Sequence, residues 1–321
     1  MTSADPASTV LPPTVSRRTT SSGLEVLTVT NAHGTAELYL QGAHVTSWVP
    51  TGHDPVLWLS SASDFAPGVP IRGGIPLCFP WFGPREGDPD APAHGYARRT
   101  VWTLVDAYEQ HDVASEERLG SSRPGQVDSG GGPVTVVRLA LGAPDDGFAE
   151  FAGLEAVYEV SVGRTLDVAL TVTVTGQVPV RFEEAQHTYL RVLDVEQTAV
   201  HGLEGVGYYD KAAAQGTDPR TGPEGAPVAP SGQVDRVYQG TVEPLRVVDG
   251  ARTVVVTKRS SQSTVVWSPG AELAARIADM GAGEWRQMIC VETCNVGEHA
   301  VVLQPGESHT LASSYEVVLE P

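Results

Sequence analysis

Hydrophobic and polar residues alternate with a period of two along most of the chain. The alternation is clearest in segments rich in β-branched residues, at 24–30, 36–50, 134–141, 166–175, 252–259, 263–269 and 300–319. Gly, Pro, Asn and Asp lie between these segments, as is typical of turns between strands. Helical periodicity is almost absent, and 271–280 is the one short helix candidate. This pattern predicts an all-β protein built as a large antiparallel β-sandwich.

The predicted sandwich occupies nearly the whole chain. Residues 1–22 lack the apolar core of a signal peptide, and we interpret them as a disordered N-terminal tail. Two polar, Gly-rich segments, 111–133 and 212–232, interrupt the pattern as insertions, and the second follows the sequence YYDK. No repeat of about 20 to 50 residues is evident. We therefore expect a single domain over residues 23–321.

Composition narrows the classes of partner. The chain has 39 acidic and 21 basic residues and a net charge of -18, which argues against nucleic acid or an anionic membrane as partner. An anionic small molecule would need a local cluster of arginines. The three cysteines are too few for a disulfide framework, and no His or Cys cluster completes a metal site with Cys290 and Cys294. We expect a cytoplasmic monomer without metal or cofactor.

The segment RGGIPLCFPWFGP, residues 72–84, does not fit a strand or a helix. Its prolines remove backbone donors and its glycines disfavour regular structure, so the segment predicts a rigid loop lined by aromatic residues. The sequence HGYAR, residues 94–98, follows closely. Together these segments carry Arg72 and Arg98, and loops of this kind often form binding sites.

Two other segments concentrate reactive side chains. In EEAQHTYLRVLD, strand alternation puts His187 on a polar face with Glu183 and Tyr189. In MICVETCNV, Glu292 ends an apolar run, where partial desolvation would raise the pKa of its carboxyl group. A single strand histidine or glutamate is more often a structural or solvated residue than a catalytic one. The spacing alone therefore assigns neither residue a role.

The motifs RGGIPLCFPWFGP, HGYAR, AQHTYLRVLD, GYYDK and MICVETCNV, in this order, resemble those of the hexose-6-phosphate mutarotases of the aldose 1-epimerase superfamily. The resemblance runs from about residue 24 to the end of the chain. It implies a β-sandwich of the galactose-mutarotase type. It further implies His187 and Glu292 as the catalytic acid/base pair, and Arg72, Arg98 and Asp210 as substrate-binding residues.

One position departs from the family pattern. Some members carry a glutamine that contacts the substrate directly before HG, where this chain has Ala93. The lost contact can be supplied by water or by His94. The sequence therefore leaves the choice among glucose, galactose and mannose 6-phosphates open.

The resemblance implies interconversion of the α and β anomers of a hexose 6-phosphate, most readily glucose 6-phosphate. This reaction needs one general acid and one general base and no cofactor. Arginines suit the phosphate because their planar guanidinium groups form charge-assisted hydrogen bonds. Two alternatives stay open: a non-catalytic β-sandwich that binds carbohydrate or phosphosugar, and a mutarotase for unphosphorylated aldoses. A purely structural protein ranks last, because it would not need the polar groups of the loop motifs.

Overall fold

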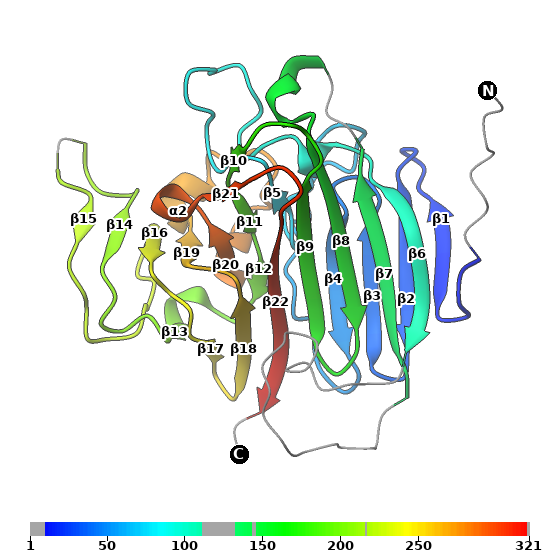
Figure 1. Ribbon diagram of the computed structural model, residues 1–321. Coiled ribbons are helices and arrows are strands. Elements are labelled where there is room, and N and C mark those ends of the chain that lie inside the picture. Colours follow the sequence, from blue (N-terminus) through cyan, green and yellow to red (C-terminus); the bar gives the residue numbers. More distant parts are fainter. Residues whose placement is uncertain (1–9, 111–131, 143–145, 216, 320–321) are drawn as a thin grey trace, which may run out of the picture.

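The chain folds into antiparallel sheets whose strands follow the alternating segments of the sequence (Figure 1). The computed structural model describes residues 10–110, 132–142, 146–215 and 217–319. Within these residues the strands form two eight-stranded sheets, one four-stranded sheet and one two-stranded sheet. The predicted all-β, antiparallel class is confirmed.

The four-stranded sheet lies at the N-terminal end of the described chain. Its strands, in spatial order, are β1 (Val15–Thr19), β2 (Glu25–Asn31), β3 (Gly34–Tyr39) and β4 (His44–Pro50). This sheet packs against one face of the first eight-stranded sheet (Figure 1).

The first eight-stranded sheet supplies much of the core. Its spatial order is β13 (Ala199–His201), β17 (Leu245–Asp249), β18 (Arg252–Arg259), β22 (Ser308–Leu319), β9 (Leu166–Val174), β8 (Leu154–Val162), β7 (Val134–Leu141) and β6 (Thr103–Gln110). Alternate residues of β9, from Leu166 to Val174, are buried in the main hydrophobic core. Full burial of one such Val or Leu side chain contributes roughly 1.5–3 kcal/mol.

The second eight-stranded sheet carries the candidate site, and we call it the site sheet. Its spatial order is β15 (Arg220–Thr221), β14 (Tyr208–Asp210), β16 (Val234–Gln239), β19 (Ser263–Ser268), β20 (Met288–Asn295), β11 (Glu184–Gln186) and β5 (Leu77–Cys78), and β12 (Tyr189–Arg191) also pairs with β20.

The remaining elements are short. Strands β10 (Val180–Phe182) and β21 (Val301–Leu303) form the two-stranded sheet. The described helices are α2 (Gly270–Ala274) and the 3₁₀ turns η1 (Ala97–Arg99), η2 (Asp146–Phe151), η3 (Val195–Gln197), η4 (Glu284–Gln287) and η5 (Gly297–His299). None of these described helices has the length and apolar character needed to cross a membrane.

The predicted disordered tail is wrong for residues 15–19. These residues form β1, which pairs with β2 from Val15↔Val29 to Thr19↔Glu25. Val15 faces the core, whereas the outward side chains form ion pairs such as Arg17–Glu25. An edge strand with a single buried residue leaves no alternating pattern, which is why the sequence did not reveal it. Residues 1–9 lie outside the described residues.

Two other expectations need adjustment. The helix expected over 271–280 is shorter, because after Ala274 the hydrogen bonds change to the i→i−3 pattern, as in Ile277 N–H to the Ala274 carbonyl. The expected insertion 212–232 contains the strand β15, which pairs with β14. The other insertion, 111–133, lies almost entirely outside the described residues.

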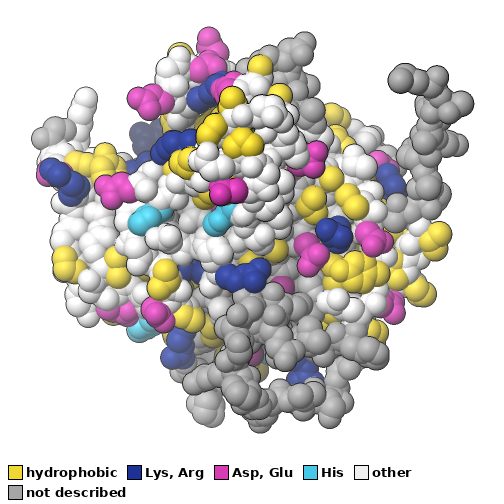
Figure 2. All heavy atoms as spheres, in the orientation of Figure 1, with side chains coloured by type: hydrophobic (Ala, Val, Ile, Leu, Met, Phe, Trp, Pro, Cys, Tyr) yellow, Lys and Arg dark blue, Asp and Glu magenta, His cyan; other side chains and the backbone are white. Residues whose placement is uncertain are grey.

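Acidic and basic side chains are interspersed over the face shown in Figure 2. Although the net charge of the chain is -18, the charged side chains on this face form small groups of either sign. A locally basic site can exist within such a surface because solvent and salt screen exposed charges beyond about 10 Å.

Candidate active site

The two predicted catalytic side chains come from adjoining segments of the site sheet. Glu292 lies within β20, a strand whose residues are all buried. His187 lies between β11 and β12, both of which pair with β20. The backbone there is fixed, because His187 N–H donates to the Pro76 carbonyl at 3.0 Å and Val291 N–H donates to the Thr188 carbonyl at 3.1 Å. Segments about 100 residues apart are thereby held in one register.

His187 and Glu292 face each other. The distance from His187 Nε2 to Glu292 Oε1 is 3.5 Å, and the residues are 8% and 1% exposed. Within the described residues, His187 Nδ1 and Glu292 Oε2 have no hydrogen-bond partner. Buried polar atoms are normally paired, so two unsatisfied atoms in one pair are typical of a site that awaits a ligand.

Burial shifts both pKa values toward the neutral forms. Burial, together with the nearby charges of Arg98 and Arg72, lowers the pKa of His187 to about 3. Burial raises the pKa of Glu292 well above its ordinary value, and the charge of Asp235 adds to this effect. The pair therefore favours a neutral imidazole beside a protonated carboxyl group. The carboxyl group of Glu292 therefore holds a proton that the pair can exchange with a ligand.

Aromatic rings fix the orientation of His187. The imidazole stacks on Tyr189 with the ring centroids 4.8 Å apart and the planes 8° apart. Trp267 and His94 contact it edge-on, at centroid distances of 6.2 and 5.7 Å. This packing leaves the ring few alternative rotamers, which suits a group that must transfer a proton in a defined direction.

The glycines after Arg72 let the loop approach its neighbours closely. Gly73 and Gly74 both have positive φ, at 118° and 62°. A Cβ at Gly74 would collide with the Val45 carbonyl oxygen, and one at Gly73 would lie 2.5 Å from the Trp58 carbonyl oxygen. The RGG sequence is therefore required for the backbone that positions Arg72.

Arg72 is held by two partners. Its Nε and Nη2 donate to the carboxylate of Asp279, at 3.0–3.2 Å. Its Nη1 donates to the Tyr189 hydroxyl at 3.1 Å, next to the stacked His187 ring. One N–H on each terminal nitrogen stays available, because a guanidinium has five N–H donors. Arg72 thus offers a positioned pair of donors, while Asp279 offsets its charge.

The HGYAR segment lies on another side of the pair. His94 has a positive φ of 65°, and its Nδ1 accepts a hydrogen bond from Gly83 N–H at 3.3 Å. Burial and the charge of Arg98 lower the pKa of His94 well below its ordinary value. His94 is thus neutral, with its other nitrogen free to donate. Arg98 Nη2 donates to the Ala93 carbonyl oxygen at 2.8 Å.

The aromatic residues of the 72–84 loop divide between two roles. Trp81 is 7% exposed and packs against Tyr96, Phe148 and Phe151, so it belongs to the core. Phe82 is half-buried and contacts the His94 ring edge-on at 4.8 Å. Of these two aromatics, only Phe82 presents a surface next to the site.

Asp235 emerges in place of Asp210 as the carboxylate near the pair. Asp210 Oδ1 accepts from Ala212 N–H in a tight turn, and Asp210 is not among the charges that shift the pKa of Glu292. Asp235, on β16, is the largest of those charges. It shares a cross-strand row with Trp267 and Cys290, on the same sheet face as Glu292. No local sequence pattern singles out Asp235, because its place beside Glu292 depends on the register of β16, β19 and β20.

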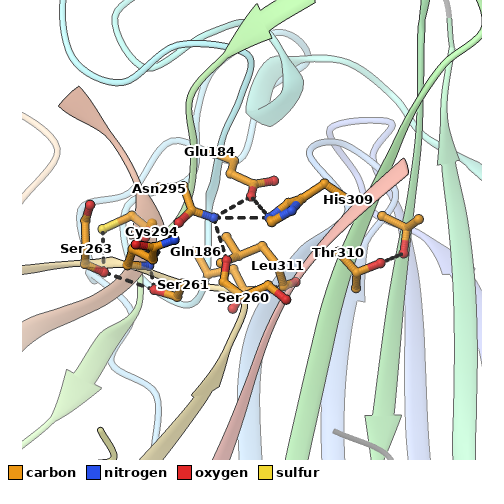
Figure 3. A network of polar contacts seen from close by, with 12 residues as sticks. Glu184, Gln186, Ser260, Ser261, Ser263, Cys294, Asn295, His309, Thr310 and Leu311 are labelled. Carbon is orange, nitrogen blue, oxygen red and sulfur yellow. Dashed lines mark hydrogen bonds and ion pairs between the residues drawn. The ribbon is translucent and has the colours of Figure 1, made fainter. Parts of the chain in front are cut away.

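The opposite face of β20 carries a separate polar network (Figure 3). Glu184 is fully buried, and its Oε1 contacts Asn295 Nδ2 and His309 Nε2, each at 2.9 Å. Asn295 Nδ2 also donates to the Ser260 carbonyl oxygen at 2.7 Å. This network ties β11, β20 and β22 together behind the site. It therefore supports the strands next to His187 and Glu292.

The described residues do not include a group of three or more His, Cys, Asp or Glu side chains placed to hold a metal ion. Four of the five predicted site residues come together: the charges of Arg72 and Arg98 act on His187, which faces Glu292. Asp210 does not join them.

Comparison with known proteins identifies the family. The family model described as aldose 1-epimerase matches residues 25–129 and 133–316. A protein of Escherichia coli K12 named "Putative glucose-6-phosphate 1-epimerase" is 32% identical, over 95% of this chain and 94% of that protein. One of Cenchrus ciliaris with the same name is 31% identical, over 90% of this chain and 83% of that protein.

Solved structures show the same fold. A crystal structure from Salmonella typhimurium, described as a putative mutarotase, superposes with a TM-score of 0.82 at 26% identity and covers 97% of this chain and 96% of its own. A crystal structure from Escherichia coli K12, described as a putative aldose 1-epimerase, gives a TM-score of 0.63 at 14% identity and covers 92% of this chain and all of its own, which supports the fold. The predicted galactose-mutarotase type of sandwich is thus confirmed, and the chain belongs to the aldose 1-epimerase family.

Proposed function

We propose that this protein interconverts the α and β anomers of a hexose 6-phosphate, with glucose 6-phosphate as the expected substrate and without a cofactor. The observation that carries the proposal is the buried His187–Glu292 pair, separated by 3.5 Å, in which each residue keeps one unsatisfied polar atom. Membership of the aldose 1-epimerase family supports the reaction class. The names of the relatives support the phosphorylated substrate.

The chemistry needs two coordinated proton transfers. One group removes the proton of the C1 hydroxyl while the other protonates the ring oxygen, and the ring opens to the aldehyde. Rotation about the C1–C2 bond followed by the reverse transfers closes the ring on its other face. We assign the base at O1 to Glu292 and the acid at the ring oxygen to His187. Each positioned acid or base typically accelerates such a step by about 10²- to 10⁴-fold.

This assignment starts from a charged pair, whereas the substrate-free pair favours its neutral form. Both forms hold one proton, so substrate binding has only to move it from Glu292 to His187. Arg98 is the charge that lowers the pKa of His187 most. A phosphate dianion bound at Arg98 would offset that charge and raise the pKa of His187. The substrate itself would then favour the imidazolium that protonates the ring oxygen.

The two arginines are proposed as substrate-binding residues with different tasks. Asp279 offsets the charge of Arg72, so Arg72 suits neutral sugar hydroxyls. Arg98 Nε is buried and has no hydrogen-bond partner among the described residues, so Arg98 suits the phosphate. We propose Asp235, rather than Asp210, as the acceptor for a further sugar hydroxyl.

The experiment that tests the proposal compares His187→Ala and Glu292→Gln with wild-type protein by NMR magnetisation transfer between the anomers of glucose 6-phosphate. Each variant is expected to lose at least 10²-fold in the catalysed exchange rate. Glu316→Gln is the matched control, because Glu316 is exposed on β22, outside the site sheet. Full activity in either site variant would remove that residue from the mechanism.

The same assay with glucose addresses the alternative of a mutarotase for unphosphorylated aldoses. Arg72 is held by Asp279, whose carboxylate offsets the charge of Arg72. Arg72 therefore favours binding of neutral hydroxyls, which both substrates provide. We expect exchange of glucose 6-phosphate to exceed that of glucose in kcat/KM. A reversed order would favour the alternative.

A further inference from the structure

Three cations surround the catalytic pair, and they differ in their partners. Arg72, Arg98 and Lys211 all act on the pKa of His187. Arg72 forms a two-pronged ion pair with Asp279. Arg98 donates to one carbonyl oxygen, and its buried Nε lacks a partner among the described residues. The charge of Lys211 opposes the burial that raises the pKa of Asp235, but no described carboxylate lies within ion-pair distance of Lys211. Two of the three cations therefore lack a carboxylate in direct contact.

These two side chains both lie against the segment that carries His94. Lys211 contacts the Phe82 ring, and Phe82 in turn contacts the His94 ring at 4.8 Å. Arg98 donates to the carbonyl oxygen of Ala93, the residue before His94. Both cations also influence the pKa values of His94, His187 and Glu292. Arg72 instead contacts Tyr189 and Asp279. Two unpaired cations facing the same small set of side chains form a local positive potential, which attracts an anion.

Lys211 is an exposed residue, but both its backbone and its ammonium group have contacts next to the site. Its backbone N–H donates to the Asp235 carbonyl oxygen at 2.7 Å. Its ammonium lies over the Phe82 ring, 5.3 Å from the ring centroid. Contact with a ring face restrains a lysine without neutralising its charge. The ammonium is thus held at the border of the site with hydrogen-bond donors to spare.

A groove lined by Lys211 lies on the same sheet as the His187–Glu292 pair. It has a volume of about 600 Å³, and Phe82, Lys211 and Val237 are among its lining residues, whereas His187 and Glu292 are not. Val237 on β16 pairs with Val265 on β19, and Val265 pairs with Glu292 on β20. Because directly paired residues lie on the same side of a sheet, the groove and the His187–Glu292 pair share one face of the site sheet. The two strand spacings between β20 and β16 amount to roughly 10 Å. A sugar with C1 at Glu292 can therefore extend its far end along this face toward Lys211.

The other charges along the groove are already satisfied or remote. Arg220 forms a close ion pair with Asp218. The Glu183 carboxylate accepts hydrogen bonds from Phe82 N–H at 3.0 Å and Gly297 N–H at 2.8 Å. Glu298 lies in the turn at the far end and is not among the charges acting on the catalytic pair. Lys211 is therefore the available cation of the groove at the end nearest the pair.

We propose that Lys211 binds the phosphate of the substrate together with Arg98, and that Lys211 is the residue that selects a phosphorylated sugar over the plain sugar. The inference rests on the proposed function, because it takes the sugar's C1 to lie at the His187–Glu292 pair. It gives a role to Lys211, the last residue of the GYYDK motif, to which the family resemblance assigned no role. It also assigns the groove to the phosphate end of the substrate.

The test is Lys211→Met, which keeps the apolar contact with Phe82 and removes the charge. Arg220→Met is the matched control, because Arg220 lines the same groove but is paired with Asp218. Binding of glucose 6-phosphate and of glucose is measured by calorimetry or NMR titration. Loss of one charge-assisted hydrogen bond predicts about tenfold weaker binding of glucose 6-phosphate in Lys211→Met. The loss for glucose should be at least fivefold smaller, and Lys211→Arg should restore most of the affinity.

Equal losses for the two sugars, unchanged binding of glucose 6-phosphate in Lys211→Met, or no binding of glucose 6-phosphate by wild-type protein would each overturn the inference. Anomer exchange is recorded on the same samples. If wild-type protein binds glucose 6-phosphate in a Lys211-dependent way but does not accelerate exchange, the proposed function fails while the phosphate contact stands. If exchange is accelerated but Lys211→Met changes neither binding nor exchange, the proposed function stands and the phosphate contact of Lys211 fails.

Discussion

The buried Glu184–His309 pair predicts that the stability of this protein depends on pH through one histidine. Glu184 Oε1 accepts a hydrogen bond from Asn295 Nδ2 and forms an ion pair with His309 Nε2, each at 2.9 Å. Both contacts lie behind the strand that carries Glu292. Burial lowers the pKa of His309, but the hydrogen bond and charge of Glu184 outweigh this effect and raise it overall. The stabilisation is therefore fully present below the unfolded-state pKa of about 6.5 and is lost as the pH rises through the folded-state pKa.

The perturbation is His309→Gln, which keeps a polar side chain but is neutral at every pH. A hydrogen bond to a charged group contributes roughly 1.5–3 kcal/mol against about 1 kcal/mol for a neutral one. The His309 side chain is 22% exposed, so solvent screening favours the lower part of this range. We expect the variant to be about 1 kcal/mol less stable than wild-type protein at pH 5.5. With an unfolding entropy of about 2 cal/mol/K per residue, this corresponds to roughly 1–2 °C in Tm.

The assay is thermal and urea unfolding followed by circular dichroism at pH 5.5 and pH 9. The difference between wild-type and variant should shrink toward pH 9, where His309 is neutral in both folded and unfolded protein. His201→Gln is the matched control, because His201 pairs with Glu204 at 3.1 Å with both side chains well exposed. That variant should change stability by less than about 0.5 kcal/mol at either pH. If the stability difference between wild-type protein and His309→Gln stays constant or grows with pH, the charged form of His309 does not stabilise the fold.

Two further substitutions test the site. Asp279→Asn removes the charged partner that holds Arg72, so kcat/KM should fall by about tenfold for glucose 6-phosphate and for glucose alike; a loss confined to the phosphorylated sugar in steady-state kinetics would show that Arg72 serves the phosphate instead. Asp235→Asn removes the charge that most raises the pKa of Glu292, so that pKa falls. In the pH profile of kcat/KM, the limb that depends on Glu292 should shift to lower pH, and an unshifted limb would contradict the electrostatic link.

The strand pattern of the sequence was sufficient to predict the fold class. Segments such as 166–175 and 252–259 alternate so regularly that their strands β9 and β18 follow directly. The strand β1 could not be predicted, because one buried valine and four exposed residues carry no periodic signal. The helix over 271–280 was overestimated, because local propensity does not show where the hydrogen-bond pattern changes.

The candidate site was predicted from sequence only in part. His187, Glu292, Arg72 and Arg98 lie in motifs with unusual composition, which is why a resemblance could single them out. Their grouping depends on strand register between distant segments, which no local pattern encodes. The partner of Arg72, Asp279, and the carboxylate of Asp235 follow from tertiary packing alone.

Alternation could not predict the burial of His187. The strand pattern puts His187 on a polar face with Glu183, but the imidazole is almost fully buried between rings. The residue owes its burial to the 72–84 and 94–98 loops, which cover the sheet from outside. Such loop packing over a sheet face cannot be predicted from the strand itself.

The most direct test of the central claim is the rate of anomer exchange in glucose 6-phosphate with wild-type protein. Magnetisation transfer between the C1 protons of the α and β forms measures this rate at equilibrium, without coupling enzymes. If the His187–Glu292 pair catalyses anomer exchange, the rate rises in proportion to protein concentration and far exceeds the spontaneous rate in the same buffer. Exchange at the spontaneous rate, at protein concentrations where glucose 6-phosphate binds, would contradict this claim.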